Sequence, residues 1–378
     1  MTVSESQTVR IYDTFLFDGE LDLLEHRLRE TFDLVDRFVL VEAAETFRGE
    51  RKPLMYSANR ERFAWAAAKI LPVALNGLGG PSRTSWDRQA FQRNAILLGL
   101  ADARPDDIVL LLDSDEIVSR SLLERLRTHG LDGPHRLAMT RHYEYLDQIG
   151  PRSPCCPPLD AAFAFEADRI RPGDWDALDA HWHGHSGIAV RHRDIVDDSD
   201  ASAQLHSPYA FRRLVLDAPL LPQAGRHFVA VDPGARLESK LGRVSHAELG
   251  DARAKYPYFL ERARTGAVHH HGWWYAETPT GPLPEDLQRL AERTPAARRP
   301  GPMPPMRRRR LFRSWAWLRY WPVLPDNMVY SIDRHFAVLV FPLAPLLLMA
   351  DMIRAMGARF RWRWLRGMSS SPGNQGHG

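Results

Sequence analysis

Two carboxylates stand directly after an apolar stretch, at a spacing that suits a metal site. Asp113 and Asp115 follow the unbroken apolar residues 108–112. Such a run is typical of a central parallel strand that is buried on both faces. In extended backbone, side chains at positions i and i+2 leave on the same side, so these carboxylates can hold one hard cation that would neutralise a bound diphosphate. The alternative is a solvated turn, but like charges crowded at a sheet edge are unfavourable unless a cation or donors compensate them.

The segments around this pair alternate between strand and helix patterns. Strands are predicted at residues 9–17, 37–42, 69–74, 106–113, 136–145 and 223–231, and helices at residues 20–30, 61–68, 86–103, 121–129, 233–249 and 255–265. Asp18 is expected to cap the first helix. The alternation predicts an α/β fold with a mostly parallel sheet and helices on both faces. Ligands of such sheets bind at the carboxyl ends of the strands. Residues 278–306, dense in proline, arginine and glycine, are expected to form an extended connector.

The chain of 378 residues has a small net charge of +3 and only two cysteines. Its length suffices for one large α/β domain with appendages or for two ordinary domains. Cys155 and Cys156 are adjacent, which excludes an ordinary disulfide framework and a Cys-x-x-Cys zinc site and favours a reducing compartment. Residues 1–10 are polar without an apolar core, so we expect neither a signal peptide nor an N-terminal anchor and place the main domain in the cytoplasm.

The C-terminal part of the chain combines basic clusters with aromatic and apolar residues. Residues 307–321 mix arginine with tryptophan, residues 336–350 form an apolar run interrupted by proline, and residues 359–366 are basic again. The apolar run is short for a spanning helix, so we expect residues 311–378 to form a helical tail that docks on an anionic membrane surface. The alternative is a helical hairpin packed on the main domain. Arginine beside aromatic residues also occurs in nucleic-acid-binding segments, but the adjacent apolar run favours lipid, and we expect no nucleic acid partner.

Several segments taken together resemble one enzyme family. They are residues 11–25, 35–36, 38–42, 46–47, 52–54, 86–88, 91–94 and 113–117, followed more faintly by residues 225–228, 240–241 and 245–248. In these segments the chain resembles glycosyltransferase family 17, the β-1,4-mannosyl-glycoprotein 4-β-N-acetylglucosaminyltransferase family, in a bacterial form. The resemblance extends over residues 9–290 and is closest before residue 120.

The resemblance implies a GT-A fold, the Rossmann-like fold of nucleotide-diphospho-sugar transferases. It also implies a UDP-N-acetylglucosamine (UDP-GlcNAc) donor, a divalent cation (Mn²⁺ or Mg²⁺) and inversion at the anomeric carbon. The cation would act as a Lewis acid on the departing UDP. With the composition, this gives the expected organisation: a polar tail at residues 1–8, a GT-A domain at residues 9–290, a Pro/Arg-rich linker at residues 291–310 and the membrane-associating tail at residues 311–378.

The resemblance and the strand ends together give the candidate site residues. Asp113 and Asp115 are expected to bind the metal, with Glu116 as a supporting carboxylate. The donor-binding candidates are Tyr12, Asp13, Glu20, Glu42, Arg88, Arg93, Asn94 and His246. The alternatives are a structural hydrogen bond for Asp13 and Glu42, ion pairing for the arginines and a first-turn helix carboxylate for Glu20. An inverting transferase needs a general base, and the candidates for it are Glu144, Glu166, Asp174 and Glu248.

These observations predict an inverting glycosyltransferase that moves N-acetylglucosamine from UDP-GlcNAc onto a glycan or lipid-linked glycan acceptor. We expect it to be a peripheral protein on the cytoplasmic face of a membrane. Two alternatives stay open. A metal-dependent nucleotide-sugar hydrolase would use the same carboxylates to activate water, and a non-catalytic protein would bind a sugar nucleotide or glycan without turnover.

Overall fold

The structure is a computed structural model of the chain. It describes residues 9–80, 83–149, 183–195, 207–209, 212, 218–229, 231, 282–302 and 305. All of these belong to the first of two compact units, Met1–Val329. The tail predicted at residues 311–378 and the helices predicted at residues 233–249 and 255–265 lie outside the described residues. Within the described part of the chain, no helix is both long enough and apolar enough to cross a membrane.

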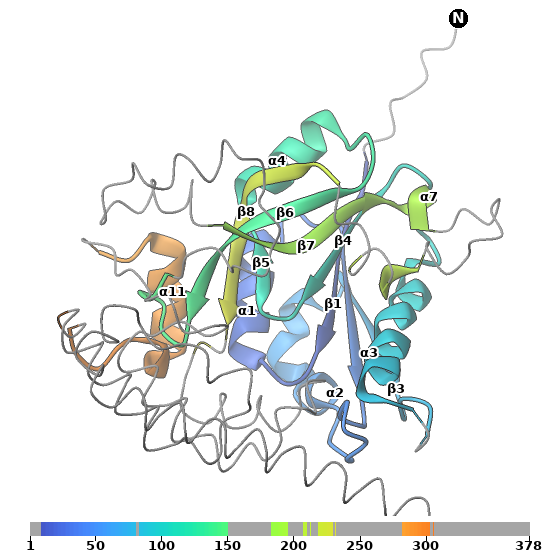
Figure 1. The fold of residues 1–378 in the computed structure, drawn as a ribbon, viewed down its shortest axis with the longest axis horizontal. Coiled ribbons are helices and arrows are strands. Elements are labelled where there is room, and N and C mark those ends of the chain that lie inside the picture. Colours follow the sequence, from blue (N-terminus) through green and yellow to red (C-terminus); the bar gives the residue numbers. More distant parts are fainter. Residues whose placement is uncertain are drawn as a thin grey trace, which may run out of the picture. The chain divides into compact units, whose positions relative to one another are not determined.

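The central feature of the described part is an eight-stranded sheet with the order β3-β2-β1-β4-β7-β6-β8-β5 (Figure 1). The strands are β1 (Ile11–Phe17), β2 (Arg37–Ala43), β3 (Ile70–Leu75), β4 (Ile108–Asp113), β5 (Glu116–Val118), β6 (His135–Tyr143), β7 (His183–Arg191) and β8 (Leu220–Val229). β3, β2, β1 and β4 run parallel, whereas β7 is antiparallel to both β4 and β6, and β5 is antiparallel to β8. The α/β class is confirmed. β6 and β8 pair parallel, so the sheet is mixed but mostly parallel, as predicted, and only β7 and β5 run against their neighbours.

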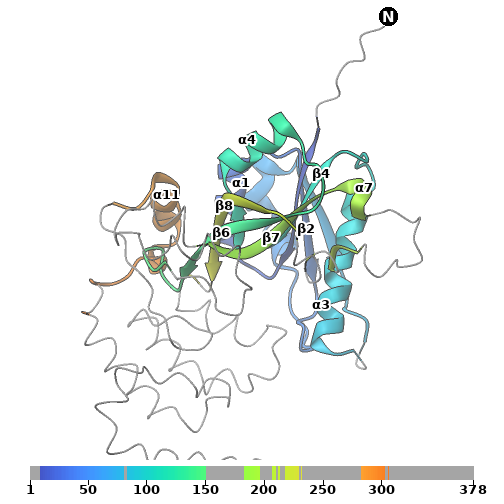
Figure 2. The ribbon, with the colours of Figure 1, turned by 45° about the horizontal axis from the view of Figure 1, so that its top comes forward.

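The strands β1 and β4 send alternate side chains into two apolar layers. In β1, Ile11 and Phe15 pack into one layer, and Tyr12 and Leu16 pack into the other. The first layer is completed by α1 (Leu21–Thr31), α2 (Met55–Ala58), η1 (Arg60–Ala66) and α4 (Arg120–His129), and the second by η2 (Ala95–Leu100) and α7 (His192–Ile195). Figure 2 shows α1 and α4 on one side of the parallel strands and α3 (Ser85–Asn94) on the other. The expected coverage of both faces is confirmed, as the period-2 pattern of a doubly buried sheet requires.

Local capping chemistry sets the start of two helices next to the sheet. Thr84 and Asp87 form a capping box at the start of α3, each side chain accepting a backbone N–H of the other residue. Ser119 caps α4 by accepting the N–H of Leu122. Both helices therefore begin within one residue of their predicted starts.

Two predicted details of the helices are wrong. The N-cap residue of α1 is Glu20, because Asp18 instead forms an ion pair with Lys52 at 2.6 Å. The long helix predicted at residues 86–103 changes to the 3-10 helix η2 after α3. In η2 the backbone lies close to β2, since a Cβ on Gly99 would lie 2.3 Å from Cγ1 of Val39.

The extended connector predicted at residues 278–306 is wrong over its middle part. Residues Glu285–Arg293 form the helix α11, followed by the 3-10 turn η5 (Pro295–Ala297). Leu287 and Leu290 of α11 are buried against Leu23 and Phe228 in a separate apolar cluster. The apolar residues recur at helical spacing, but the surrounding proline and arginine mask that pattern. The domain end expected at residue 290 thus falls inside a helix.

Candidate functional site

The carboxyl ends of β1 and β4 mark the point where the chain reverses direction across the sheet. From β1 the chain proceeds through β2 to β3 on one side, and β4 then pairs with β1 on the other side. In open α/β sheets, ligands bind in the crevice outside the strand ends at such a reversal. The predicted metal residues lie at this point, since β4 ends at Asp113.

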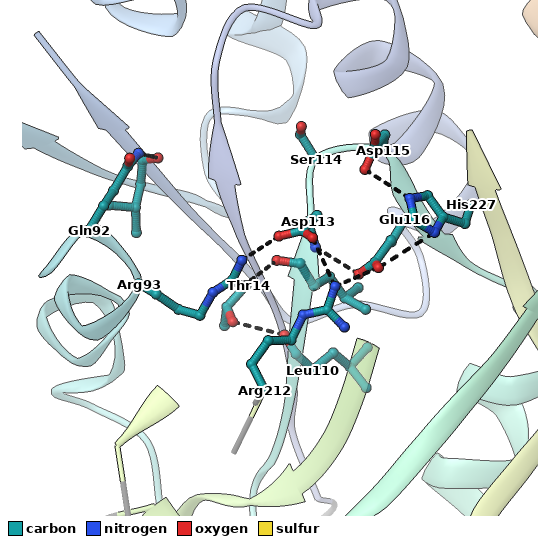
Figure 3. A network of polar contacts seen from close by, with 12 residues as sticks. Thr14, Gln92, Arg93, Leu110, Asp113, Ser114, Asp115, Glu116, Arg212 and His227 are labelled. Atoms are coloured by element: carbon teal, nitrogen blue, oxygen red, sulfur yellow. Dashed lines mark hydrogen bonds and ion pairs between the residues drawn. The ribbon is translucent and has the colours of Figure 1, made fainter. Parts of the chain in front are cut away.

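Asp113 and Asp115 contact different partners, because residues 114 and 115 form a turn between β4 and β5. The extended backbone expected here is wrong, and with it the expected common direction of the two side chains. Asp113 accepts hydrogen bonds from Arg93 and, at 2.8 Å, from Arg212. Asp115 is 4% exposed, and its Oδ1 lies 3.5 Å from Nε2 of His227. Figure 3 shows Asp113 directed at the arginines and Asp115 at the histidine.

Glu116 is the third carboxylate of this turn and joins its parts together. Its Oε2 accepts the backbone N–H of Asp113 at 2.9 Å, and its Oε1 accepts a hydrogen bond from Arg212 at 2.5 Å. Nδ1 of His227 lies 3.8 Å from the same Oε1, and the hydroxyl of Ser186 lies 3.0 Å from that nitrogen. Glu116 is therefore part of the charged network itself, in agreement with its expected supporting role.

These side chains line a cavity of about 260 Å³, which we call the carboxylate pocket. It is lined by Asp113, Glu116, Arg93, Arg141, Arg212, His227, Gln89 and Tyr209. Desolvation would raise the pKa of Asp113, but the guanidinium groups of Arg93 and Arg212 lower it below its usual range, so this carboxylate stays ionised at neutral pH. Three arginines face two carboxylates. The resulting excess of positive charge suits an anionic ligand such as a diphosphate.

A buried arginine supports the turn from the α1 side. Arg27 is 1% exposed. It donates to the carboxylate of Asp13 at 2.6 Å, to the backbone carbonyl of Asp113 at 2.7 Å and to that of Glu116. Its guanidinium also lies over the ring of Phe15, 4.1 Å from the ring centroid. Arg27 thus holds the backbone of the turn whose side chains line the carboxylate pocket.

Three predicted donor-binding residues instead have partners within the fold. Asp13 is buried and paired with Arg27. Tyr12 is buried near the amino end of β1, away from the strand ends, and donates to Asp102 at 3.0 Å. Glu20 accepts the backbone N–H of residue 18 at 3.1 Å at the start of α1. Each of these side chains thus has a partner within the fold, as in the structural alternative for Asp13 and Glu20, although Oδ2 of Asp13 is buried without a hydrogen bond.

Glu42 and Arg88 also have structural partners. The buried Glu42 accepts the backbone N–H groups of Tyr56 and Ser57 at 2.9 and 3.0 Å, so it satisfies the free donors at the start of α2. Arg88 is buried and pairs with Glu45 at 3.1 Å. Neither residue lines the carboxylate pocket, and both have contacts of the kind that the structural alternative describes.

Arg93 is the predicted donor-binding residue that the structure does place in the carboxylate pocket. The side chain of Asn94 accepts the backbone N–H of Tyr209 at 3.0 Å, so it positions a residue that lines the pocket. His246 lies outside the described residues. Arg93 therefore lines the carboxylate pocket, and Asn94 supports one of its lining residues.

The described part of the chain contains one of the four candidate bases. Glu144 is buried and follows β6 with a φ of 58°, and its N–H donates to the carbonyl of Val229 at 3.1 Å. A general base must reach the acceptor hydroxyl, so burial argues against Glu144. The candidates Glu166, Asp174 and Glu248 lie outside the described residues and stay predictions.

Four basic residues of the pocket and its support were not among the predicted site residues. His227 lies in the short segment 225–228 that resembles the family, which is the signal that points to it. Arg27 lies on the apolar face of its helix, three positions after a buried leucine, where an unpaired cation is unfavourable. Arg141 and Arg212 have no comparable local signal, because only the folded chain brings them to residues 113–116.

The carboxylates of the turn suit a divalent cation by their chemistry, since Mg²⁺ and Mn²⁺ prefer oxygen ligands. Among the described residues, no three histidine, cysteine or carboxylate side chains converge with coordinating geometry. The space between Asp113 and Glu116 instead contains the guanidinium of Arg212. A cation at these carboxylates therefore requires Arg212 to move.

The part of the chain that carries this turn matches a known family. The match to glycosyltransferase family 17 covers residues 2–146. The β-1,4-mannosyl-glycoprotein 4-β-N-acetylglucosaminyltransferases of Rattus norvegicus and Homo sapiens are each 30% identical over 118 residues, which is 29% of this chain and 22% of theirs. The chain thus spans about a fifth of the length of these curated relatives.

Among solved structures, glucosyl-3-phosphoglycerate synthase from Mycobacterium tuberculosis is 14% identical and aligns over 73% of this chain and 88% of that chain. The TM-score of this alignment is 0.28. The family match covers β1 to β6 and the whole 113–116 turn. The part of the chain that is similar to glycosyltransferase family 17 is thus residues 2–146, less than half of the 378 residues.

Proposed function

We propose that the chain is an inverting glycosyltransferase of GT-A fold that moves N-acetylglucosamine from UDP-GlcNAc onto a glycan or lipid-linked glycan. The observation that carries this proposal is the carboxylate pocket, a basic cavity at the sheet reversal whose residues Arg93, Asp113 and Glu116 lie in the part that matches family 17. The names of the curated relatives support the donor sugar. A hydrolase would use the same pocket, so product analysis must separate the two activities.

In this proposal the arginines of the pocket bind the diphosphate of the donor. Arg93 and Arg212 already donate to Asp113, and Arg141 lines the same cavity. Guanidinium groups bind phosphate oxygens through paired, charge-assisted hydrogen bonds. They would stabilise the negative charge that develops on UDP as the glycosidic bond breaks.

We propose that a divalent cation, Mn²⁺ or Mg²⁺, binds at the turn through Asp113 with Asp115 or Glu116. When bound, it would supply Lewis-acid stabilisation of the departing diphosphate. The chemistry of the turn supports this assignment, because Mg²⁺ and Mn²⁺ prefer oxygen ligands such as carboxylates. Glu116 is the stronger second ligand on geometry, since Arg212 already bridges it to Asp113.

We place the acceptor and its base in the part of the chain that follows β6. Glu166, Asp174 and Glu248 remain the proposed bases, and replacing each with glutamine should lower kcat strongly at only one of the three. The proposed lipid-linked acceptor and the cytoplasmic face of the membrane rest on the composition of residues 311–378. A chain ending at residue 305 that keeps its membrane partition and its activity on lipid-linked acceptors would refute this part.

The first experiment is a calorimetric titration of UDP and UDP-GlcNAc, with and without Mn²⁺, into the wild type, Asp113→Asn and Asp115→Asn. We expect metal-dependent binding that Asp113→Asn abolishes. Turnover of UDP-GlcNAc is then measured with and without a panel of glycan acceptors. Acceptor-dependent release of UDP supports a transferase, whereas equal release without acceptor identifies a hydrolase. Absence of nucleotide binding to folded wild-type protein would refute the proposal.

A further inference from the structure

The guanidinium of Arg212 spans the two carboxylates that line the carboxylate pocket. Its Nη2 donates to Oδ2 of Asp113 at 2.8 Å and to Oε1 of Glu116 at 2.5 Å. From this geometry we propose that Arg212 is the resident counter-cation of the turn, and that a divalent cation and the donor diphosphate displace it together. The proposal rests on the proposed function for the identity of its ligands.

The four carboxylate oxygens of Asp113 and Glu116 are all engaged in this arrangement. Arg93 donates to Oδ1 of Asp113, and the backbone N–H of Asp113 donates to Oε2 of Glu116. The remaining two oxygens are the ones that Arg212 holds. A metal ion that binds both carboxylates must therefore take the place of Arg212, since two cations at one pair of oxygens repel each other.

The turn does not depend on Arg212 for its backbone. Arg27 donates to the carbonyl of Asp113 at 2.7 Å, and Arg93 donates to the carbonyl of Leu112 at 3.1 Å. Both arginines come from helices that are packed on the sheet, whereas Arg212 reaches the turn from 99 residues further along the chain. Arg212 can thus leave the carboxylates while the turn keeps its shape.

A displaced Arg212 needs a new anionic partner. A guanidinium group is always charged at physiological pH, so Arg212 keeps its charge when it leaves the carboxylates. A phosphate group that arrives with the metal supplies that partner and matches the fork of guanidinium donors. Metal alone would leave Arg212 without its carboxylates, and diphosphate alone would draw Arg212 away and leave Glu116 and Oδ2 of Asp113 without their cation. Each ligand therefore favours the other, and by linkage the coupling is reciprocal.

The test measures Mn²⁺ binding by calorimetry, with and without saturating UDP, in the full-length wild type, Arg212→Met and Arg212→Lys. In the wild type we expect UDP to increase Mn²⁺ affinity by about tenfold or more, within the usual range of coupling between sites. Arg212→Met should bind Mn²⁺ alone about tenfold more tightly than the wild type and lose most of the UDP effect. Arg212→Lys keeps the charge but lacks the fork that bridges two carboxylates, and should fall between them.

Arg120→Met is the matched control, because it removes one arginine that pairs with Asp33 at 2.6 Å outside the carboxylate pocket. It should leave Mn²⁺ affinity and the UDP effect as in the wild type. Circular dichroism checks that each variant is folded. If Arg212→Met does not fold, Arg212→Lys is used in its place.

Unchanged or weaker Mn²⁺ binding when the bridge is lost would overturn the role of Arg212. If no variant binds UDP, the proposed function fails. In that case a gain of Mn²⁺ affinity in Arg212→Met still supports the counter-cation, and the absence of such a gain still overturns it.

Discussion

Replacing the buried Arg27 by methionine is expected to destabilise the protein by about 3–5 kcal/mol, the usual cost of breaking a buried ion pair. Arg27 holds Asp13 at 2.6 Å and the carbonyl of Asp113 at 2.7 Å, and it also donates to the carbonyl of Glu116. Methionine keeps much of the packing volume but leaves these acceptors without their donor. Burial already raises the pKa of Asp13 despite the opposing effect of Arg27, so the abandoned carboxyl is expected to take up a proton rather than stay charged.

Asp13→Asn should cost less, about 1–3 kcal/mol. Arg27 then keeps its bonds to the carbonyls of residues 113 and 116, and the amide oxygen still offers it an acceptor. The double variant should be more stable than the sum of the two single losses predicts, because the two residues share one interaction. Arg27→Met should also weaken UDP binding more than Asp13→Asn, since only the arginine holds the turn.

The assay is urea unfolding followed by the fluorescence of the 11 tryptophans. Arg29→Met on the same helix is the control, because the pair of Arg29 with Glu25 is partly exposed and such surface pairs contribute less than about 1 kcal/mol. If Arg27→Met costs no more than Asp13→Asn, the carbonyls of the turn do not depend on Arg27 and the reasoning is refuted.

Three further predictions concern the rest of the described fold. Burial lowers the pKa of His26 from 6.5 to about 4, so between these values the unfolded chain binds a proton that the folded chain does not. The free energy of unfolding should fall by about 3 kcal/mol as the pH drops through this window. His26→Gln should make the urea midpoint depend less on pH. The same pH dependence in the wild type and in His26→Gln would contradict the assignment. Gly225→Ala should cost about 1–3 kcal/mol in thermal unfolding, because its φ is +147° and a Cβ would lie 2.1 Å from the carbonyl of Ile117; Gly133→Ala, with open space around it, should be neutral. Leu290→Ala should cost about 2–5 kcal/mol, whereas a neutral result would favour the extended connector over α11.

The parallel half of the fold was predictable because its strands bury both faces. β1, β2 and β4 are nearly continuous apolar runs, and each begins and ends within two residues of its predicted bounds. β7 was not predictable, because its residues show no strand period and its pairing with β4 depends on contacts far apart in the sequence. α11 was missed for a different reason, since its helical spacing stands among residues that usually break helices.

The site was predictable in position but not in geometry. Asp113 lies at the end of a buried strand, as its sequence indicates. The spacing of Asp113 and Asp115 gave the wrong direction for the second side chain, because a turn replaces the extended backbone. Buried polar residues such as Glu42 cannot be separated from ligand-binding ones by residue type, since both occur at strand ends. The arginine that neutralises the turn, Arg212, comes from a segment without a local signal.

Strands β6 and β8 separate two cavities, and α11 lines the one that does not contain Asp113. Successive residues of β8 alternate between them: His227 lines the carboxylate pocket, while Arg226 and Phe228 line a second cavity of about 500 Å³. Helix α11 contributes Asp286 to that second cavity and pairs it with Arg226 at 2.7 Å. The backbone of β8 is therefore held from the α11 side next to the residue that contacts Asp115. A chain cut before residue 282 should consequently lose affinity for the diphosphate, although none of the described residues lining the carboxylate pocket comes from α11.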